Sequence, residues 1–161
     1  MILESYIINE LTLALIPSLN SEYKTVVIEN DKMLRVNQTP LEIIEHTLLL
    51  QWTTYEGRRR VVTHHTLFQR RVPLPIDIKK RVVAFPTHTE RDSNCKWIFY
   101  KHISKYFCSP DKKGTIIVFK NDQHIKVDIT PENVRKQCER AMTCIAYTAL
   151  AAINDIYALR T

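Results

Sequence analysis

Glycine is almost absent from this chain, and its scarcity restricts the folds that the chain can adopt. Only Gly57 and Gly114 occur among the 161 residues. Folds that wrap the backbone around the phosphates of a nucleotide usually need clustered glycines, because the turns are tight and the backbone must approach the ligand closely. The sequence therefore excludes a protein built around a glycine-rich phosphate loop.

Short hydrophobic runs separated by turn residues predict an α+β fold, with an antiparallel β-sheet, a central helical segment and a long C-terminal helix. Asn30 and Asp31 form one turn signal between two such runs, and residues 121–123 form another. We expect strands at residues 11–16, 23–29, 33–36, 76–78, 81–85, 96–103, 115–120 and 124–128. Since no linker or repeat divides the sequence, we expect a single domain over residues 1–161.

Two Thr-Pro pairs mark helix starts, at residues 39–40 and 130–131. Threonine can cap a helix, and proline suits the first helical position. The spacing of apolar residues predicts helices over residues 40–52, 58–68 and 131–153 or beyond, with a break at residues 55–57. Trp52 is the last apolar residue in the pattern of the first helix. Pro73 and Pro75 predict an extended loop after the second helix.

Positive charge is concentrated in the segment from Gly57 to Lys105. This segment holds twelve Lys and Arg residues and three acidic residues, a local charge of +9, whereas the rest of the chain carries −3. Within it lie three clusters of basic residues, namely Arg58, Arg59 and Arg60, then Arg70 and Arg71, then Lys79, Lys80 and Arg81. Surfaces that only need to be soluble normally mix the two signs of charge.

We interpret the three basic clusters as contacts to DNA. The planar guanidinium of arginine fits phosphates and base edges, and adjacent arginines repel one another unless an anion is near. The alternative for any one cluster is a charged, solvated loop. Taken together, and with the local charge of +9, the clusters favour a nucleic-acid partner. The aromatic residues do not form the motif of an RNA-recognition sheet, and Tyr100 and Phe107 are expected in the core.

The sequence offers no pattern for a metal, a cofactor or catalysis. His88, Cys95, His102 and Cys108 lack the paired spacing of zinc ligands. We expect the four cysteines, Cys95, Cys108, Cys138 and Cys144, to be reduced core residues of a cytoplasmic protein, with no cofactor bound. The amino terminus does not resemble a signal peptide, and no apolar stretch is long enough for a membrane span. A nuclease remains an alternative, although paired carboxylates are missing from the basic segment.

Five short motifs follow one another along the first two thirds of the chain. They are Leu3-Glu4-Ser5-Tyr6, Pro40-Leu41-Glu42-Ile43-Ile44, Tyr55-x-Gly57-Arg58, Phe85-Pro86-Thr87 and Cys95-x-Trp97-Ile98-x-x-x-His102. In the order and spacing of these motifs, the chain resembles the ComK family, the activators of genetic competence in low-GC Gram-positive bacteria. The resemblance extends from Leu3 to Ile103 and more weakly to Ile129.

The resemblance implies a transcription activator of the competence (DNA-uptake) regulon. Such a protein binds double-stranded, A/T-rich boxes chiefly through the minor groove as a cooperative oligomer, and is controlled by proteolysis through an adaptor protein. Arginine suits this target, because a narrow A-tract minor groove has an enhanced negative potential. Arg58 lies in a family-like motif and is the strongest single candidate for DNA contact, with Gly57 as a permissive turn that presents it.

Family members extend further at the carboxyl end, with a charged tail. The alternative reading is therefore a shortened, non-enzymatic modulator that associates with a full-length activator. The last helix offers a surface for association, because its second half is apolar on more than one face. We hypothesise a homo-oligomer with Ala149, Ile153 and Ile156 near the contact, since an exposed apolar patch is rare on a monomer. The competing expectation is a helix buried within its own domain.

Overall fold

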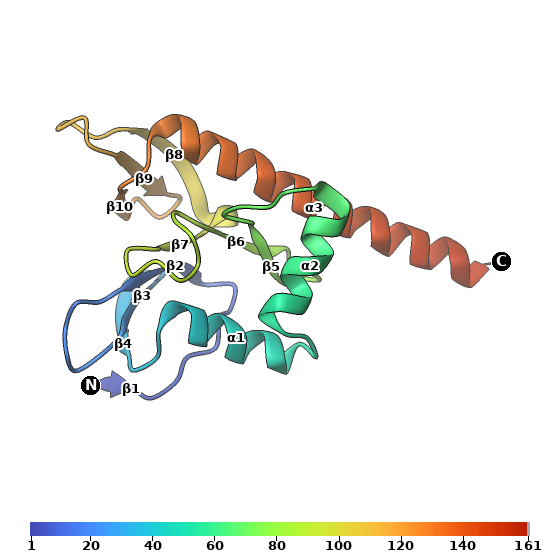
Figure 1. The fold of residues 1–161 in the computed structure, drawn as a ribbon, viewed down its shortest axis with the longest axis horizontal. Helices are drawn as coiled ribbons and strands as arrows, with labels where there is room; N and C mark the ends of the chain where they lie inside the picture. Colours follow the sequence, from blue (N-terminus) through green and yellow to red (C-terminus); the bar gives the residue numbers. More distant parts are fainter. Residues whose placement is uncertain (161) are drawn as a thin grey trace.

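Over residues 1–160, whose backbone the computed structural model describes, the chain forms two β-sheets, three α-helices and one 3₁₀ turn (Figure 1). Side chains are described for these residues except 156, 157, 159 and 160. The strands are β1 (Ile2–Leu3), β2 (Thr12–Pro17), β3 (Thr25–Glu29), β4 (Lys32–Val36), β5 (Leu74–Asp77), β6 (Val82–Pro86), β7 (Trp97–Phe99), β8 (Ile103–Cys108), β9 (Thr115–Phe119) and β10 (His124–Val127). The helices are α1 (Pro40–Leu50), α2 (Tyr55–Thr66) and α3 (Pro131–Arg160), and the 3₁₀ turn is η1 (Tyr100–His102).

Both sheets are dominated by antiparallel pairing. The larger sheet has seven strands in the order β1-β4-β3-β2-β7-β6-β5, and only β1 and β4 pair in parallel among its described strands. The smaller sheet has the order β10-β9-β8 and is antiparallel. With α1 and α2 between β4 and β5, and the long α3 at the end, the structure confirms the expected α+β fold.

The larger sheet is covered on both faces. On one face, α1 and the start of α2 pack around Trp97, which is fully buried. On the other, the smaller sheet and the first half of α3 pack around Phe85 and Phe119. A third cluster, which includes Val62 and Cys144, joins α2 to α3. The two helices therefore meet beside β5, one of the two edge strands of the larger sheet.

Both Thr-Pro pairs begin helices, as predicted. The Thr39 hydroxyl accepts a hydrogen bond from the N–H of Glu42 at 3.1 Å, and the Glu42 carboxylate accepts one from the N–H of Thr39 at 3.3 Å. This reciprocal pair is a capping box, which satisfies backbone donors that a helix start leaves without partners. At α3, the Thr130 hydroxyl accepts a hydrogen bond from the N–H of Asn133 at 3.2 Å.

The boundary between α1 and α2 differs from the prediction. The first helix ends at Leu50, and Trp52 is 96% exposed with a left-handed φ of 63°, so its expected place on an apolar helix face is wrong. Residues 55–57 begin α2 instead of breaking a helix, because the Thr54 hydroxyl accepts a hydrogen bond from the N–H of Gly57 at 2.9 Å. Gly57 is therefore in a first helical turn, where an added Cβ would lie 2.9 Å from the Thr54 hydroxyl oxygen.

Three predictions about the strand regions also need correction. The expected strand over residues 96–103 is split by η1 into β7 and β8, which belong to different sheets. On β8, Phe107 is 46% exposed and is not the core residue that we expected. Pro75 lies within β5 and not in a loop. An edge strand can accept a proline, because one of its sides has no neighbouring strand to which an N–H must donate.

Among the side chains that the structure describes, those of the long helix α3 are buried only in its first half. Ala141 and Cys144 pack against the sheet, whereas Leu150 and Ile153 are 55% and 47% exposed. The last turns project away from the rest of the protein (Figure 1). The expectation that the second half is buried within its own domain is therefore wrong. Over the residues that the structure describes, no helix has the length and hydropathy needed to cross a membrane.

Candidate nucleic-acid interface

The eight basic residues predicted to contact DNA lie on three consecutive segments around the β5 edge. Arg58, Arg59 and Arg60 are on α2, Arg70 and Arg71 are in the loop between α2 and β5, and Lys79, Lys80 and Arg81 form the turn between β5 and β6. Arg58, Arg59 and Arg71 are half-buried, and the other five side chains are exposed. The structure separates these residues into two groups, because the loop and the turn lie at opposite ends of the β5–β6 hairpin.

Arg58 has a structural contact at the β5 edge. Its Nη1 donates a hydrogen bond of 2.6 Å to the carbonyl oxygen of Pro75, which fastens α2 to β5. Burial lowers the pKa of the guanidinium, and the negative charge of Asp77 opposes that effect. The predicted presentation of Arg58 by a turn at Gly57 is wrong, because both residues lie within α2. One N–H of Arg58 therefore stabilises the packing of α2 against β5.

The loop after α2 is held between α2 and α3 by two arginines. Arg59 Nη2 donates a hydrogen bond of 2.7 Å to the carbonyl oxygen of Gln69. Arg140 Nη1 donates to the carbonyl oxygens of Arg70 at 2.9 Å and Arg71 at 3.3 Å. The guanidinium carbon of Arg140 also lies 4.2 Å from the centre of the Phe68 ring, a cation–π geometry. These contacts fix the backbone that carries Arg70 and Arg71.

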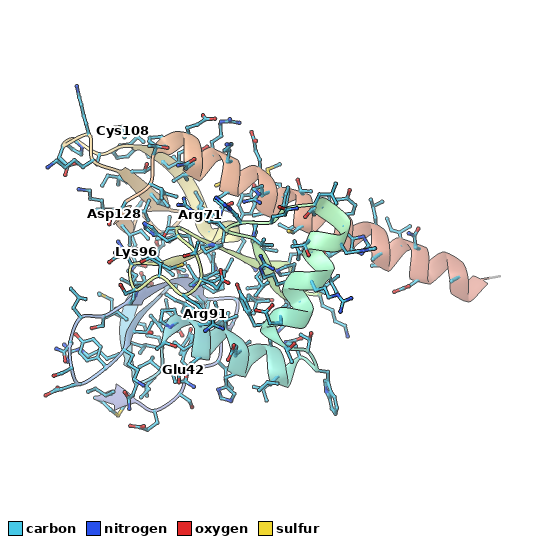
Figure 2. The ribbon with its side chains drawn as sticks, viewed as in Figure 1. Glu42, Arg71, Arg91, Lys96, Cys108 and Asp128 are labelled. Carbon is cyan, nitrogen blue, oxygen red and sulfur yellow. The ribbon has the colours of Figure 1, made fainter. Side chains whose placement is uncertain are left out.

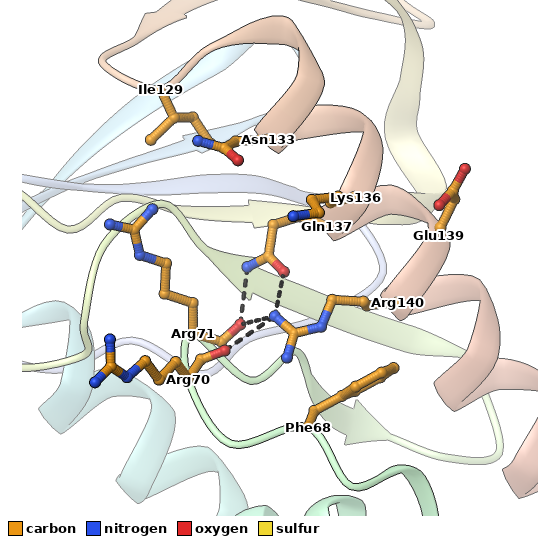
Figure 3. A pocket seen from close by; sticks show the side chains of 9 residues that line it. All are labelled: Phe68, Arg70, Arg71, Ile129, Asn133, Lys136, Gln137, Glu139 and Arg140. Carbon is orange, nitrogen blue, oxygen red and sulfur yellow. Dashed lines mark hydrogen bonds between the residues drawn. The ribbon is translucent and has the colours of Figure 1, made fainter.

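A cavity of about 450 Å³ opens between this loop and the first half of α3 (Figure 3). Its basic lining residues are Arg70, Arg71, Lys136 and Arg140. The cavity also contains Glu139, but the carboxylate of Glu139 is bound by Arg135 at 2.5 Å. None of the ion pairs among the described residues involves Arg70, Arg71 or Lys136. Their charges are therefore available to an anion.

Arg59 and Arg60 line a second cavity with Gln69 of the same loop. We call these two residues and the four basic residues of the first cavity the α2-loop group, comprising Arg59, Arg60, Arg70, Arg71, Lys136 and Arg140. Lys136 and Arg140 were not predicted from the sequence. Their separation by four residues on a helix, which places them on the same face, was the available signal. Gln137 also lines the cavity, and its amide donates hydrogen bonds of 2.8 Å to the carbonyl oxygens of both Arg71 and Pro86. Figure 2 shows Arg71 between α3 and the larger sheet.

The β5–β6 turn carries the second group. The N–H of Lys80 donates to the Asp77 carboxylate at 3.0 Å, and the N–H of Arg81 donates to the Ile78 carbonyl at 3.2 Å. These bonds fold a tight turn in which Arg81 has a left-handed φ of 56°. Lys80 and Arg81 line a separate cavity of about 340 Å³, together with Lys101 and Lys120. We call Lys79, Lys80, Arg81, Lys101 and Lys120 the turn group.

The cysteines lie outside both basic groups. Cys95, Cys138 and Cys144 are buried, and burial raises the pKa of each thiol to about 11. These thiols stay protonated at neutral pH, which makes them poor nucleophiles and poor metal ligands. Cys108 is exposed at the end of β8 (Figure 2), so its expected place in the core is wrong. In the described part of the chain, no group of three or more His, Cys, Asp or Glu side chains could hold a metal ion.

These features define an α+β protein with a basic surface around β5, where several arginines and lysines form no ion pair with another described residue. The sequence profile of the family described as ComK protein matches residues 3–150, so the chain belongs to the ComK family. The chain is also 27% identical over 139 residues to the competence transcription factor of Bacillus subtilis (strain 168). The aligned residues make up 86% of this chain and 72% of that protein. No solved structure matches the chain.

Proposed function

We propose that this chain is a non-enzymatic, DNA-binding transcription activator of competence genes that acts in the bacterial cytoplasm as a single domain over residues 1–161. Membership of the ComK family and similarity to a competence transcription factor support this function. The observation that carries the DNA-binding part is the α2-loop group, where Arg70, Arg71 and Lys136 border one cavity without an ion-pair partner among the described residues.

In this proposal the α2-loop group binds A/T-rich DNA through the minor groove. An α-helix with its side chains is about 10–12 Å wide, whereas the minor groove of B-DNA is about 6 Å wide. A groove of that width admits single arginine side chains, and Arg70 and Arg71 extend from a loop instead of a helix. Lys136 and Arg60 would neutralise phosphates beside the groove, and Arg58 would support them by holding α2 on β5.

Binding to labelled duplexes tests the proposal. The chain should bind an A/T-rich duplex more tightly than a G/C-rich duplex of the same length, and the logarithm of its affinity should fall linearly with the logarithm of salt concentration. The double variant Arg70→Gln, Arg71→Gln should weaken binding and lose most of the preference for A/T-rich DNA. Failure of the parent chain to bind either duplex at low salt would contradict the proposed function.

We further propose that α3 joins two copies of the chain. Met142, Ala146, Ala149 and Ile153 recur at spacings of four, three and four residues, which aligns them in one stripe along the helix. Ala149 is half-buried and the other three are exposed. Small alanines let two helices approach closely, and the apolar ends of the stripe would be buried in a dimer. The side chain of Ile156, the third residue predicted at this contact, lies outside the described residues.

A dimer suits DNA binding, because two copies present their basic surfaces to two half-sites of one duplex. The same stripe would serve the alternative function, a modulator that associates with a full-length activator. The two functions differ in what the chain does alone. An activator binds A/T-rich DNA without a partner, whereas the modulator needs the activator for tight binding.

A further inference from the structure

The cavity beside the β5–β6 turn is bordered by four cations from three separate parts of the chain. Lys80 and Arg81 come from the turn, Lys101 from η1, and Lys120 from the residue after β9. The cavity has a volume of about 340 Å³, and its other lining residues are Tyr100, Ile103 and Ile145. None of the lining residues is acidic.

Backbone hydrogen bonds hold these segments together. The N–H of Lys120 donates to the carbonyl oxygen of His102 at 2.8 Å, which brings the end of β9 against η1. The Arg81 backbone is fixed in the left-handed region by the tight turn, so its side chain leaves the hairpin at a set position. The cluster is therefore a product of the tertiary fold and not of a basic run in the sequence.

The charges of this cluster are not balanced within the described part of the protein. None of the ion pairs among those residues involves Lys80, Arg81, Lys101 or Lys120. Burial lowers the pKa of the neighbouring His102, and the positive charges of Lys101 and Lys120 lower it further. Both lysines thus act on the same small region. Four like charges around one cavity repel one another, and a bound anion would relieve that repulsion.

The cavity faces a different side of α3 from the α2-loop group. Arg140, which contacts the α2 loop, and Ile145, which lines this cavity, are five residues apart on the helix. At 3.6 residues per turn, their side chains point about 140° apart around the helix axis. The two basic groups therefore lie on opposite flanks of the helix.

We propose that Lys80, Arg81, Lys101 and Lys120 form a second site for phosphodiester groups, which holds the backbone of the same DNA on the flank of α3 opposite the α2-loop group. This inference rests on the proposed function. It assigns DNA contact to Lys101 and Lys120. Each copy of the protein would then contact the DNA backbone at two separate places. Phosphate contacts of this kind add affinity without reading the base sequence.

The test compares two variants with the same loss of charge. Lys101→Gln with Lys120→Gln removes two cations from the cavity, and Lys112→Gln with Lys113→Gln removes two exposed cations from the β8–β9 loop. In salt titrations with an A/T-rich duplex, the first variant should flatten the slope of log affinity against log salt by about 2, because each phosphate contact contributes about 1. Its preference for A/T-rich over G/C-rich DNA should be unchanged. The second variant should match the parent.

Three results would overturn the inference, and each is distinguishable from failure of the proposed function. In the first, the parent binds DNA and Arg70→Gln, Arg71→Gln weakens it, but the cavity variant has the same slope as the loop variant. In the second, calorimetry with inorganic pyrophosphate shows binding that the cavity variant loses while its DNA slope stays at the parent value. The cavity would then bind free phosphate and not DNA.

In the third, the cavity variant loses its preference for A/T-rich DNA, which would mean that the cavity residues read the base sequence. If the parent binds no DNA at all, both the proposed function and this inference are wrong. Circular dichroism checks that each variant is folded.

Discussion

The guanidinium of Arg140 lies over the ring of Phe68, with the central carbon 4.2 Å from the ring centre, and in this way joins α3 to the loop that follows α2. The same guanidinium donates hydrogen bonds to the carbonyl oxygens of Arg70 and Arg71. Burial lowers its pKa, but an arginine remains charged at any physiological pH. One side chain therefore links the position of the proposed DNA-binding loop to the packing of α3.

Replacing Arg140 with leucine should weaken both stability and DNA binding. The change removes the hydrogen bonds to two loop carbonyls and should cost about 1–2 kcal/mol of unfolding free energy, measured by urea denaturation. DNA affinity should fall although Arg70 and Arg71 are intact, because their backbone is no longer fixed and because the α2-loop group loses one cation. Arg135→Leu is the control, since Arg135 is exposed and forms ion pairs with Glu132 and Glu139 on its own helix. Equal DNA affinities for the two variants would refute the positioning role.

Arg58 and Arg60 should respond differently to the same substitution. Arg58→Gln removes the charged donor that binds the Pro75 carbonyl, and we expect a loss of about 1–2 kcal/mol in unfolding free energy. Arg60 has an exposed side chain, so Arg60→Gln should change the unfolding free energy by less than about 0.5 kcal/mol. Its effect should instead appear as a flatter salt dependence of DNA binding. If Arg58→Gln proved as stable as the parent, Arg58 would not fasten α2 to β5.

The protein should lose stability in alkaline solution. Tyr6 donates a hydrogen bond of 2.6 Å to the buried Glu29 carboxylate, and burial, together with this carboxylate, raises the pKa of the Tyr6 hydroxyl. Burial also raises the pKa of Tyr55. In the unfolded chain both hydroxyls ionise near pH 10, while in the folded protein they keep their protons. The unfolded state therefore binds fewer protons above that pH, and stability falls as pH rises.

The variant Tyr6→Phe provides the check on this alkaline loss. It should be less stable than the parent at pH 7, because Glu29 loses a buried hydrogen-bond donor. Between pH 9 and 11, roughly the range in which unfolded tyrosines ionise, its stability should decline less steeply than that of the parent. Parallel pH profiles for the two proteins would show that Tyr6 does not contribute to the decline.

One thiol of four should react quickly with a thiol reagent at pH 8. Cys108 is exposed, whereas Cys95, Cys138 and Cys144 are buried and burial raises the pKa of each to about 11. The thiolate is the reactive form, so the buried residues should react only as the protein unfolds. A spectrophotometric assay should give one fast equivalent in the parent and none in Cys108→Ser. A fast equivalent that persists in Cys108→Ser would contradict the burial of the other three thiols.

Local chemistry made the helix starts predictable, whereas tertiary contacts decided the positions that were missed. Thr39 and Thr130 cap helices through bonds to residues only three positions away, which a sequence displays directly. The break within residues 96–103 depends on β7 and β8 pairing with strands of different sheets. No nearby residue encodes that choice.

In the candidate site, too, the features within one cluster were predictable, whereas those that depend on tertiary contacts were not. Sequence clustering identified arginines and lysines that surround the β5 edge, but it did not show that the structure divides them into two groups. The separation arises because Arg71 and Arg81 lie at opposite ends of the β5–β6 hairpin. Lys101 and Lys120 were not predicted because each is an isolated lysine in the sequence. Their segments are brought together by tertiary contacts, namely the hydrogen bond from Lys120 to His102 and the pairing of Ile103 with Phe119.

The final prediction concerns the stripe of apolar residues on α3. Ile153 is 47% exposed on a helix that projects from the rest of the protein, so it has little contact with its own domain. Ile153→Glu should therefore leave the fold intact but place a charge in the proposed helix–helix contact, where a buried and unpaired carboxylate is costly. In sedimentation velocity at micromolar concentration, the parent should run as a dimer and Ile153→Glu as a folded monomer. Asn154→Glu adds the same charge to the next residue, which points about 100° away around the helix axis, and should remain dimeric. If the parent and both variants sediment as folded monomers, the dimer proposal is wrong; if all three sediment as dimers, the contact lies elsewhere on the protein.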